Sequence, residues 1–508
     1  MFAKTFGAAT NGIDGVIIDV EVDVSSGMPR FDMVGLPDAS VRESKERVRT
    51  GIKNAGIKLR QENVTVNLAP AGIRKDSSGL DLPIAVALLA AYGIIPPESI
   101  RNALFSAEMS LEGEMRSVPG ILPMVIKARD SGIPRVYVAK ENINEALLVD
   151  DIEVYSVPGI AELVEYLNGR AEWQPEIKKH SEEKAFEEDE DFADVQGQFL
   201  AKRAFEIAAA GGHNILLVGS PGAGKSMLSK RLGSILPEME KKEALEVTKI
   251  YSIAGLLKDN RGLVSKRPFR SPHHTTSAVA LIGGGSIPRP GEVTLSHNGV
   301  LFLDELPEFS KQALEVLREP LEDGRITISR VNASLTFPSS IILVAAMNPC
   351  PCGYFGDKEH VCECSSVEIK RYVRRISGPL LDRIDIQIRV PRVSYKELKN
   401  REKAEASAII RKRVSDARKR QLARLSPYGL VSNSQMNHSL LMRICQLTSE
   451  AERLMEQAFN QKKLSARSYD RLIKVAQTIA DLAGSDKIDA VHIGEAIQLR
   501  GDLQLNVE

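Results

Sequence analysis

The spacing of apolar and polar residues divides the chain into three regions. In residues 1–167, strand-like runs alternate with helical ones, which predicts an α/β domain. In residues 194–390, short continuous apolar runs are followed by helical patterns, and such runs favour a parallel sheet covered on both faces. Beyond residue 391 nearly every stretch has the period of a helix.

Individual elements follow from the same pattern. In the first region we predict strands at 16–22, 64–68 and 136–138 and helices at 40–55, 82–91 and 121–131. In the second region we predict buried strands at 214–218, 300–303 and 341–346. In the third region we predict helices at 395–424, 439–461, 468–483 and 490–500.

An acidic stretch separates the first two regions. Residues 168–193 are rich in Asp and Glu and contain too few apolar residues to form a core. We therefore predict a flexible acidic linker there, a solvated stretch without a role of its own.

Length and composition limit the class of protein. The 508 residues correspond to about three domains of ~150 residues each. Lys+Arg and Asp+Glu both number 67, so the zero net charge excludes a histone-like polycation but not a local basic groove. The longest apolar run, 82–95, is interrupted by Pro83 and Gly93 and is shorter than the ~18 residues of a membrane span. Because the N-terminus has no basic start followed by an apolar core, we expect a cytoplasmic protein with no membrane partner.

A phosphate-binding loop follows the first predicted strand of the second region. Its residues match G-x-x-x-x-G-K-[ST] at every fixed position, between a strand ending at Val218 and a helical pattern. Backbone N–H groups of such a loop surround phosphates, the lysine reaches the β- and γ-phosphates, and the last hydroxyl holds Mg²⁺. We therefore predict a site for ATP and Mg²⁺ formed by Gly219, Ser220, Pro221, Gly222, Ala223, Gly224, Lys225 and Ser226.

Polar residues follow the next two apolar runs. Asp304 and Glu305 end the run that starts at Val300. We predict that Asp304 completes the Mg²⁺ shell with Ser226 and that Glu305 polarises the attacking water, which indicates hydrolysis rather than nucleotide binding alone. Asn348 ends the third run, where its amide is suited to orienting the water, although a turn-forming Asn before a proline has the same pattern.

Two arginines stand beside apolar residues at the ends of predicted elements. Arg383 lies in the segment 380–385 and Arg467 in the segment 464–467. Arginine is suited to stabilising a γ-phosphate because it stays charged and offers forked donors. On these residues alone, a surface arginine is the alternative for each.

The order of these motifs resembles that of magnesium-chelatase-like AAA+ ATPases. The segments 269–277, 283–285 and 348–353 are similar to the YifB/ComM family within that group, and the resemblance spans essentially the whole chain. It implies Asn348 as sensor 1, Arg383 as an arginine finger acting on a neighbouring subunit, and Arg467 as sensor 2 from a helical lid. A finger acting on a neighbour requires a ring, so the resemblance also implies a homo-oligomer, expected to be a hexamer.

The same resemblance extends to the N-terminal region. Residues 1–167 look like the C-terminal fold of Lon protease, so the expected fold class is α/β with a Lon-protease-C-terminal-like (ribosomal S5 domain 2-like) domain, a central AAA+ P-loop NTPase α/β domain at 194–390 and a C-terminal helical lid at 391–508. Lon uses a serine–lysine dyad. In the corresponding stretches, 75–81 and 119–123, the serine context is lost and no lysine matches, so we expect no protease activity.

One further segment resembles the DNA-contacting hairpins of related ring helicases. Residues 325–337 alternate like a β-hairpin before the third buried strand. In the related helicases such hairpins project toward the pore, so the resemblance implies Arg330, near the tip, as a DNA contact. An exposed turn arginine is the alternative.

Other basic residues give weaker predictions. The run 411–424 carries arginines that could contact nucleic-acid phosphates without sequence preference, although a solvated helix face has the same pattern. His273 and His274 are adjacent and would face opposite ways on a strand, so we do not expect them to share a metal.

Four of the five cysteines are close together in the sequence. Cys350 and Cys352 precede the loop 353–361, and Cys362 and Cys364 follow it. Four thiolates are suited to a tetrahedral structural Zn²⁺ site in a reducing compartment. The C-x-C spacing is tighter than usual, and redox-sensitive or buried thiols are the alternatives.

The motifs favour an ATPase, and the resemblance implies that it forms a ring, is stimulated by DNA and acts as a helicase on single-stranded or branched DNA. The resemblance implies branch migration of recombination intermediates during natural transformation. The first alternative is a magnesium-chelatase motor subunit for metal insertion into tetrapyrroles, which is usually shorter. The second is a protein remodeller, against which stands the lack of a clear aromatic–apolar–Gly pore loop. Aromatic residues make up 5% of the chain, so any grip on DNA is expected to be mainly electrostatic.

Overall fold

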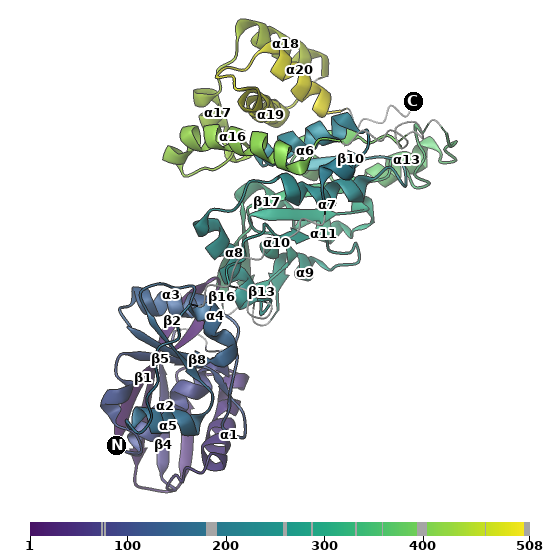
Figure 1. The fold of residues 1–508 in the computed structure, drawn as a ribbon. Coiled ribbons are helices and arrows are strands. Elements are labelled where there is room, and N and C mark those ends of the chain that lie inside the picture. The colour runs from purple at the N-terminus through teal and green to yellow at the C-terminus, as the bar shows by residue number, and fades with distance from the viewer. Residues whose placement is uncertain are drawn as a thin grey trace.

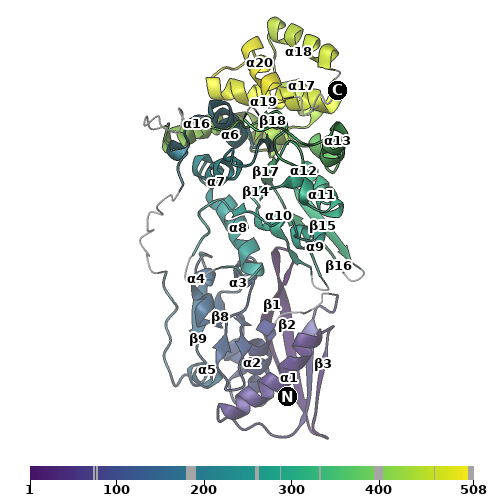
Figure 2. The ribbon, with the colours of Figure 1, turned by 90° about the vertical axis from the view of Figure 1, so that its right-hand side faces the viewer.

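The computed structural model places the three regions one after another along the molecule (Figure 1). It describes residues 1–501 except 73–74, 76–77, 179–189, 258–261, 286–287, 331–332, 358, 394–403 and 463. The N-terminal region forms one end, an α/β part lies in the middle, and a group of helices forms the other end. Figure 2 shows the same order after a quarter turn.

A mixed seven-stranded sheet forms the N-terminal region. Its strands, with one short additional pair, are β1 (Phe2–Asn11), β2 (Asp14–Ser25), β3 (Arg30–Val34), β4 (Asn63–Ala69), β5 (Ala103–Ser106), β6 (Glu108–Met109), β7 (Met115–Arg116), β8 (Arg135–Ala139) and β9 (Glu153–Val157). The order in the sheet is β3-β4-β2-β1-β5-β8-β9, and β1 and β2 pair antiparallel along all of β1. The three strands predicted here are confirmed.

Helices cover both faces of this sheet. They are α1 (Ala39–Asn54), α2 (Asp81–Ala91), α3 (Ile121–Asp130), α4 (Ile143–Ala146) and α5 (Ile160–Leu167). Consecutive residues of β8 enter different cores, since Tyr137 packs with α1, α2 and α5 and Val138 packs with α3 and α4. Every residue of α2 is buried, so the longest apolar run of the chain is a core helix. Within the described residues, no helix has both the length and the apolar character needed to cross a membrane.

The central sheet is parallel throughout. Its strands are β10 (Ile215–Val218), β11 (Phe269–Arg270), β14 (Gly299–Leu303), β17 (Ile341–Met347) and β18 (Ile386–Arg389). They lie in the order β11-β14-β17-β10-β18. Leu216 and Leu217 of β10 are fully buried in two different cores, so both faces are covered. The predicted parallel sheet and its three buried strands are confirmed.

Helices and two hairpins surround this sheet. The helices are α6 (Phe199–Gly211), α7 (Lys225–Ile235), α8 (Lys241–Ile253), α9 (Ala278–Ile282), α10 (Glu292–Leu295), α11 (Lys311–Glu315), α12 (Arg318–Asp323), α13 (Ser366–Val373) and α14 (Gly378–Leu381). The hairpins are β12 (Gly283–Gly284) with β13 (Arg289–Pro290), and β15 (Arg325–Arg330) with β16 (Ala333–Pro338). Along α7, Leu228, Leu232 and Ile235 recur at helical spacing and bury one stripe against the sheet.

The C-terminal region is helical, as predicted. Its helices are α16 (Ser407–Leu425), α17 (His438–Ile444), α18 (Ser449–Lys462), α19 (Ala466–Ala483) and α20 (Ala490–Leu499). The single helix predicted at 439–461 is wrong. The chain leaves the helix at Cys445 because Leu447 forms a β-bridge with Ile488, which divides the segment into α17 and α18. Part of the helix predicted from residue 395 lies outside the described residues.

The N-terminal region is joined to α8 by a half-buried carboxylate, that of Glu145. Glu145 accepts hydrogen bonds from the backbone N–H of Leu122 at 2.7 Å and from the hydroxyl of Ser252. The Gly120 N–H donates to the Ser252 carbonyl at 3.0 Å. Burial raises the pKa of Glu145. The turn between β1 and β2 lies beside β16, because a Cβ added to Gly12 would come within 3.7 Å of the Thr336 carbonyl.

Both ends of the predicted acidic linker pack against the regions that it joins. Trp173 stacks on Tyr166 with ring centroids 4.8 Å apart, and the Glu176 N–H donates to the Val154 carbonyl at 2.8 Å. Phe192 is fully buried in the central core. Residues 179–189 lie outside the described part, so the linker and the domain boundaries remain predictions.

Candidate nucleotide and metal sites

The phosphate-binding loop joins β10 to α7, as its sequence predicted. Gly222 and Gly224 have φ angles of +79° and +82°, a left-handed conformation that explains glycine at both positions. The loop ends at Lys225, the first residue of α7, so its backbone N–H groups lie at the start of a helix. This arrangement of a strand, a glycine-rich turn and a helix N-terminus is suited to binding phosphates.

Four predicted site residues meet in two pairs above the sheet edge, Lys225 with Asn348 and Ser226 with Asp304. The Lys225 ammonium donates to the Asn348 amide oxygen at 3.1 Å and to the carbonyls of Gly219 and Ser220 at 2.6 and 3.1 Å. Burial lowers the pKa of Lys225, against the opposing charges of Asp304 and Glu305. The Ser226 hydroxyl donates to the Asp304 carboxylate at 2.6 Å. These two oxygens are the hard ligands that Mg²⁺ prefers, so the described residues fit the predicted metal.

Glu305 has a contact that sequence reasoning missed. It adopts a φ of +51°, and its Oε2 lies 3.2 Å from Nδ1 of His274. His274 comes from the loop after β11, whose strand pairs with β14. The expectation that His273 and His274 face opposite ways is wrong, because the pair lies in a loop rather than a strand and the two ring centroids are 4.1 Å apart. The segment 269–274, Phe-Arg-Ser-Pro-His-His, was the feature of the sequence that drew attention to His274, and it did not identify Glu305 as the partner.

Gln198 is a second residue that sequence reasoning missed. It precedes α6 with a left-handed φ of +51° and donates from Nε2 to the Ala223 carbonyl at 2.6 Å. The side chain is buried, and its Oε1 has no hydrogen-bond partner among the described residues. An unused acceptor therefore lies beside the phosphate-binding loop. No motif in a single sequence distinguishes this glutamine from others.

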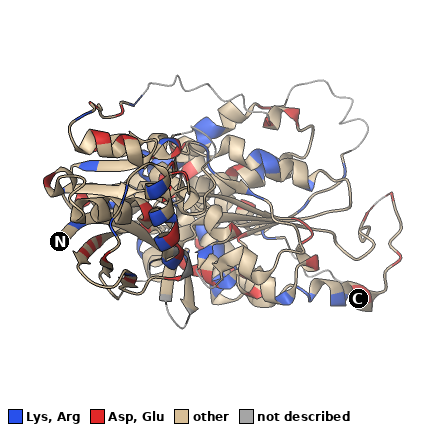
Figure 3. Ribbon diagram, turned by 90° about the horizontal axis from the view of Figure 1, so that it is seen from below, with Lys and Arg blue, Asp and Glu red and all other residues tan. Residues whose placement is uncertain are grey.

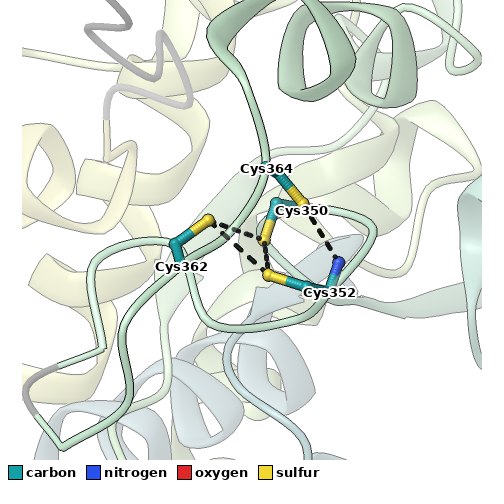
Figure 4. Close-up of side chains that lie close together, drawn as sticks. All are labelled: Cys350, Cys352, Cys362 and Cys364. Atoms are coloured by element: carbon teal, nitrogen blue, oxygen red, sulfur yellow. Dashed lines mark hydrogen bonds between the residues drawn. The ribbon is translucent and has the colours of Figure 1, made fainter.

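The four clustered cysteines converge in space (Figure 4). Their Sγ atoms all lie within 4.8 Å of one another, and Cys350 Sγ is 3.3 Å from Cys352 Sγ and 3.6 Å from Cys362 Sγ. A regular tetrahedron with ~2.3 Å Zn–S bonds has edges of about 3.8 Å. All four thiols are free, Cys350 being buried and the other three partly exposed. The donor set and its spacing fit Zn²⁺.

The segment 353–361 between the two cysteine pairs, here called the cysteine loop, contacts the phosphate-binding loop. The Ser220 hydroxyl donates to Asp357 Oδ2 at 2.5 Å. A Cβ on Gly353 would lie 2.7 Å from Cδ of Pro221, which leaves room for glycine alone at this φ of +89°. Arg392 donates to the Pro221 carbonyl at 3.1 Å from the other side. The hydroxyl of Ser220 and the N–H groups of Glu359 and His360 lower the pKa of Asp357 to about 2.

The two predicted arginines lie at the opposite edge of the sheet. Arg383 precedes β18, whose Ile386 pairs with Ile215 at the start of β10, whereas the phosphate-binding loop follows the end of β10. Arg383 is 7% exposed and forms an ion pair with Glu322. Burial and the positive charges of Arg318, Arg467 and Arg471 lower the pKa of Arg383. Arg467 is exposed in the first turn of α19.

The predicted DNA-contacting segments have different outcomes. The hairpin is confirmed as β15 and β16, and Arg330 pairs with Ala333 at its end. Its role as a DNA contact stays a prediction. On α16, Arg413 forms an ion pair with Glu206 and Arg424 one with Asp481, whereas Lys412, Lys419 and Arg420 are exposed. Part of the run therefore holds the helix to its neighbours and part forms the solvated face given as the alternative. In Figure 3, basic and acidic positions are interspersed along the elements.

Family comparisons cover nearly the whole chain. Residues 191–398 match the profile described as magnesium chelatase, subunit ChlI. Residues 20–142 match subunit ChlI of Mg-chelatase, and residues 404–500 match the C-terminal part of that subunit.

Individual relatives agree with these matches. Competence protein ComM of Haemophilus influenzae is 41% identical over 509 residues, covering 99% of this chain and 98% of that protein. The Escherichia coli protein YifB is 40% identical, covering 97% and 96% respectively. Lon protease 2 of Bacillus subtilis is 26% identical over 190 residues, 33% of this chain and 34% of that protein. Together with the two sheets and the C-terminal helices, these likenesses confirm the predicted fold class, and the chain belongs to the YifB/ComM family of magnesium-chelatase-like AAA+ proteins.

Proposed function

We propose that this protein is a Mg²⁺-dependent ATP hydrolase that forms a hexameric ring and moves along DNA as a helicase. The observation that supports hydrolysis is the meeting of Lys225, Ser226, Asp304 and Asn348 at one sheet edge, with Glu305 beside them. Nucleotide binding alone would not need a second carboxylate here, and the Glu305 side chain lies beside His274 rather than in the Ser226–Asp304 pair.

Each of these side chains has a distinct task. The Lys225 ammonium binds the β- and γ-phosphates, and its bond to Asn348 aligns the amide with the same phosphates. Ser226 and Asp304 hold Mg²⁺, which supplies charge neutralisation on the phosphate oxygens when bound. Glu305 accepts the proton of the attacking water, and His274 sets the direction in which that carboxylate points. Asn348 orients the water as sensor 1.

The arginines support a ring. The four residues of β10 span three steps of ~3.3 Å, so the phosphate-binding loop and the sheet edge that holds Arg383 are about 10 Å apart. This separation favours a contact of Arg383 with the nucleotide of a neighbouring subunit over one with its own. The positive charge of Arg467 acts on Arg383, so the two arginines lie near each other. We infer that both arginines serve the γ-phosphate bound to a neighbouring copy, Arg383 as the finger and Arg467 as sensor 2. A closed ring gives every subunit such a neighbour.

Two observations support DNA as the partner, the name of a relative and the geometry of the β15–β16 hairpin. The relative ComM is named as a competence protein. The β15–β16 hairpin places Arg330 at its end. We propose that this arginine contacts DNA phosphates in the pore, and that ATP turnover in the cytoplasm moves branched intermediates along.

We also propose that the cysteine cluster holds a structural Zn²⁺. Four free thiols within 4.8 Å of one another match the size of a tetrahedral Cys₄ site. The metal would close the loop 353–361 in the absence of any disulfide among the described residues.

One experiment separates this proposal from its alternatives. The rate of phosphate release is measured without DNA, with single-stranded DNA and with a four-way junction, and the mass of the assembly is measured in parallel. We expect a hexamer whose rate rises with DNA, most with the junction. A rate indifferent to both DNAs would refute the helicase and favour a chelatase motor or a protein remodeller. A monomer that hydrolyses ATP at full rate would refute the ring.

A further inference from the structure

The cysteine loop is placed where it can govern the phosphate-binding loop. Two of its residues contact that loop directly, since Asp357 accepts from Ser220 at 2.5 Å and Gly353 packs on Pro221. The same glycine comes within 3.9 Å of Asn348, measured from the Cβ it lacks. Both loops therefore meet at the residues expected to surround the β- and γ-phosphates.

Asp357 is fixed from several sides. Its side chain is only 5% exposed, and Oδ1 accepts from the N–H groups of Glu359 at 2.9 Å and His360 at 3.2 Å. Arg392 lies 3.7 Å from Oδ2 and stacks its guanidinium over Tyr354, 5.6 Å from the ring centroid. Because the Asp357 carboxylate is held by its own loop, it orients the Ser220 hydroxyl only while that loop is ordered.

The cysteines are what hold the two ends of that loop together. Among the described residues, Tyr354 and His360 stack inside the loop at 4.8 Å, and the ends of the loop meet at the thiols, where the Cys352 N–H donates to Cys364 Sγ at 3.4 Å. Contacts between thiols are weak, because S–H is a poor donor and sulfur a poor acceptor. A thiophilic divalent ion would replace them with four strong bonds.

We propose that the metal in the cysteine cluster braces the phosphate-binding loop through Asp357 and Ser220, so that nucleotide affinity depends on metal occupancy. This rests on the proposed nucleotide site but not on the ring or on DNA. Zn²⁺ fits the four sulfurs best, and its loss releases the ends of the loop. The phosphate-binding loop then loses conformational entropy when nucleotide binds, and this loss weakens the binding.

The size of the effect follows from the contact that is lost. A hydrogen bond from a hydroxyl to a charged acceptor is among the stronger ones in proteins, so we expect a loss of about tenfold in affinity, or about 1.4 kcal/mol. The metal acts on the phosphate-binding loop through the hydrogen bond between Ser220 and Asp357. Removing both should therefore cost little more than removing the metal alone.

The test measures the dissociation constant of a fluorescent ATP analogue together with zinc content by elemental analysis. The four proteins compared are the wild type, Cys362→Ser/Cys364→Ser, Ser220→Ala and the combined triple variant. The Cys362→Ser/Cys364→Ser variant should lose zinc and bind the ATP analogue about tenfold more weakly. Ser220→Ala should keep zinc and bind several-fold more weakly, and the triple variant should match the double. Cys445→Ala, which removes the buried cysteine outside the cluster, should keep wild-type zinc and affinity.

Several outcomes would overturn the proposal. Zinc-free protein that binds the analogue as tightly as the wild type would do so, as would effects of metal loss and Ser220→Ala that simply multiply. If the cysteine variant does not fold, a zinc-selective chelator applied to the wild type at constant Mg²⁺ gives the same comparison, and affinity should return with added Zn²⁺. Because neither readout uses DNA or the assembly, a protein without DNA stimulation would refute the helicase and leave this result standing.

Discussion

Replacing Arg383 by alanine should separate nucleotide binding from turnover. The guanidinium lies at the sheet edge opposite the phosphate-binding loop, where it is 7% exposed and paired with Glu322. If Arg383 acts as a finger on a neighbouring subunit, each variant subunit keeps a complete nucleotide pocket of its own. The pocket of the neighbouring subunit then lacks the positive charge that Arg383 supplies.

The two effects differ greatly in size. At about 10 Å through water, one charge changes the energy of another by about 0.4 kcal/mol, which alters binding in the same subunit by no more than about twofold. An arginine that contacts the γ-phosphate in the transition state is worth about 10³–10⁵ in rate. Arg383→Ala should therefore bind ATP almost normally and release phosphate at least about a thousandfold more slowly.

Mixing variants tests whether the arginine acts between subunits. Lys225→Ala lacks a working pocket but keeps its finger, so each variant is inactive alone. In randomly mixed rings at equal amounts, about a quarter of the interfaces combine an intact pocket with an intact finger. We expect up to that share of wild-type turnover, largest at equal proportions. Glu322→Gln is the matched control, since it removes the partner of Arg383 and leaves the finger in place.

Absence of recovery at any proportion, in rings shown to be mixed, would refute action in trans. So would an Arg383→Ala variant whose ATP affinity falls as steeply as its rate, because that pattern requires contact with the nucleotide of the same subunit.

The remaining predictions concern the pocket, the fold and the hairpin. Lys225→Ala should abolish ATP binding, whereas Glu305→Gln should bind ATP and stop turnover; equal loss of binding in a paired binding and phosphate-release assay would exclude Glu305 as the water-activating group. Arg471 and His213 hold the pKa of buried Asp385 well below its usual range although burial opposes them, so Asp385→Asn should destabilise the protein by about 3 kcal/mol at pH 7. Because that stabilisation is lost as pH falls below the ~3.9 of an unfolded Asp, the gap in thermal unfolding midpoint between variant and wild type should narrow in acid, and a constant gap would contradict it. Arg330→Ala should reduce DNA stimulation more than the basal rate, with a shallower salt dependence, whereas Arg325→Ala at the other end of the hairpin should not.

The parts that sequence predicted best are those set by neighbouring residues. The strand, turn and helix around Lys225 are encoded within about twenty residues, because the apolar run, the glycines and the helical stripe are local features. The hairpin ending in Arg330 was predicted for the same reason. The four cysteines were expected together because only a short loop separates the two pairs, and their sulfurs do meet.

The contacts that sequence could not predict join residues far apart in the chain. Ser220 and Asp357 are brought together only because β17 lies beside β10 in the sheet, so the segments after both strands share one edge. Glu305 meets His274 because β11 pairs with β14, although β11 is only two residues long and has no clear pattern. A single helix at 439–461 was wrong for a related reason, since helical periodicity does not reveal the β-bridge from Leu447 to Ile488.

The central sheet divides the proposed work between its two edges. At the carboxyl ends of the strands lie the groups that bind and activate, and the cysteine loop reaches only this edge, through Ser220 and Pro221. At the amino ends lie Arg383 and the buried Asp385, which Arg471 of α19 ties to the C-terminal helices. A change in metal occupancy should therefore alter nucleotide affinity in each subunit without altering what its finger does for the next. A movement of the C-terminal helices should do the reverse, so the two kinds of perturbation can be told apart by whether binding or turnover changes first.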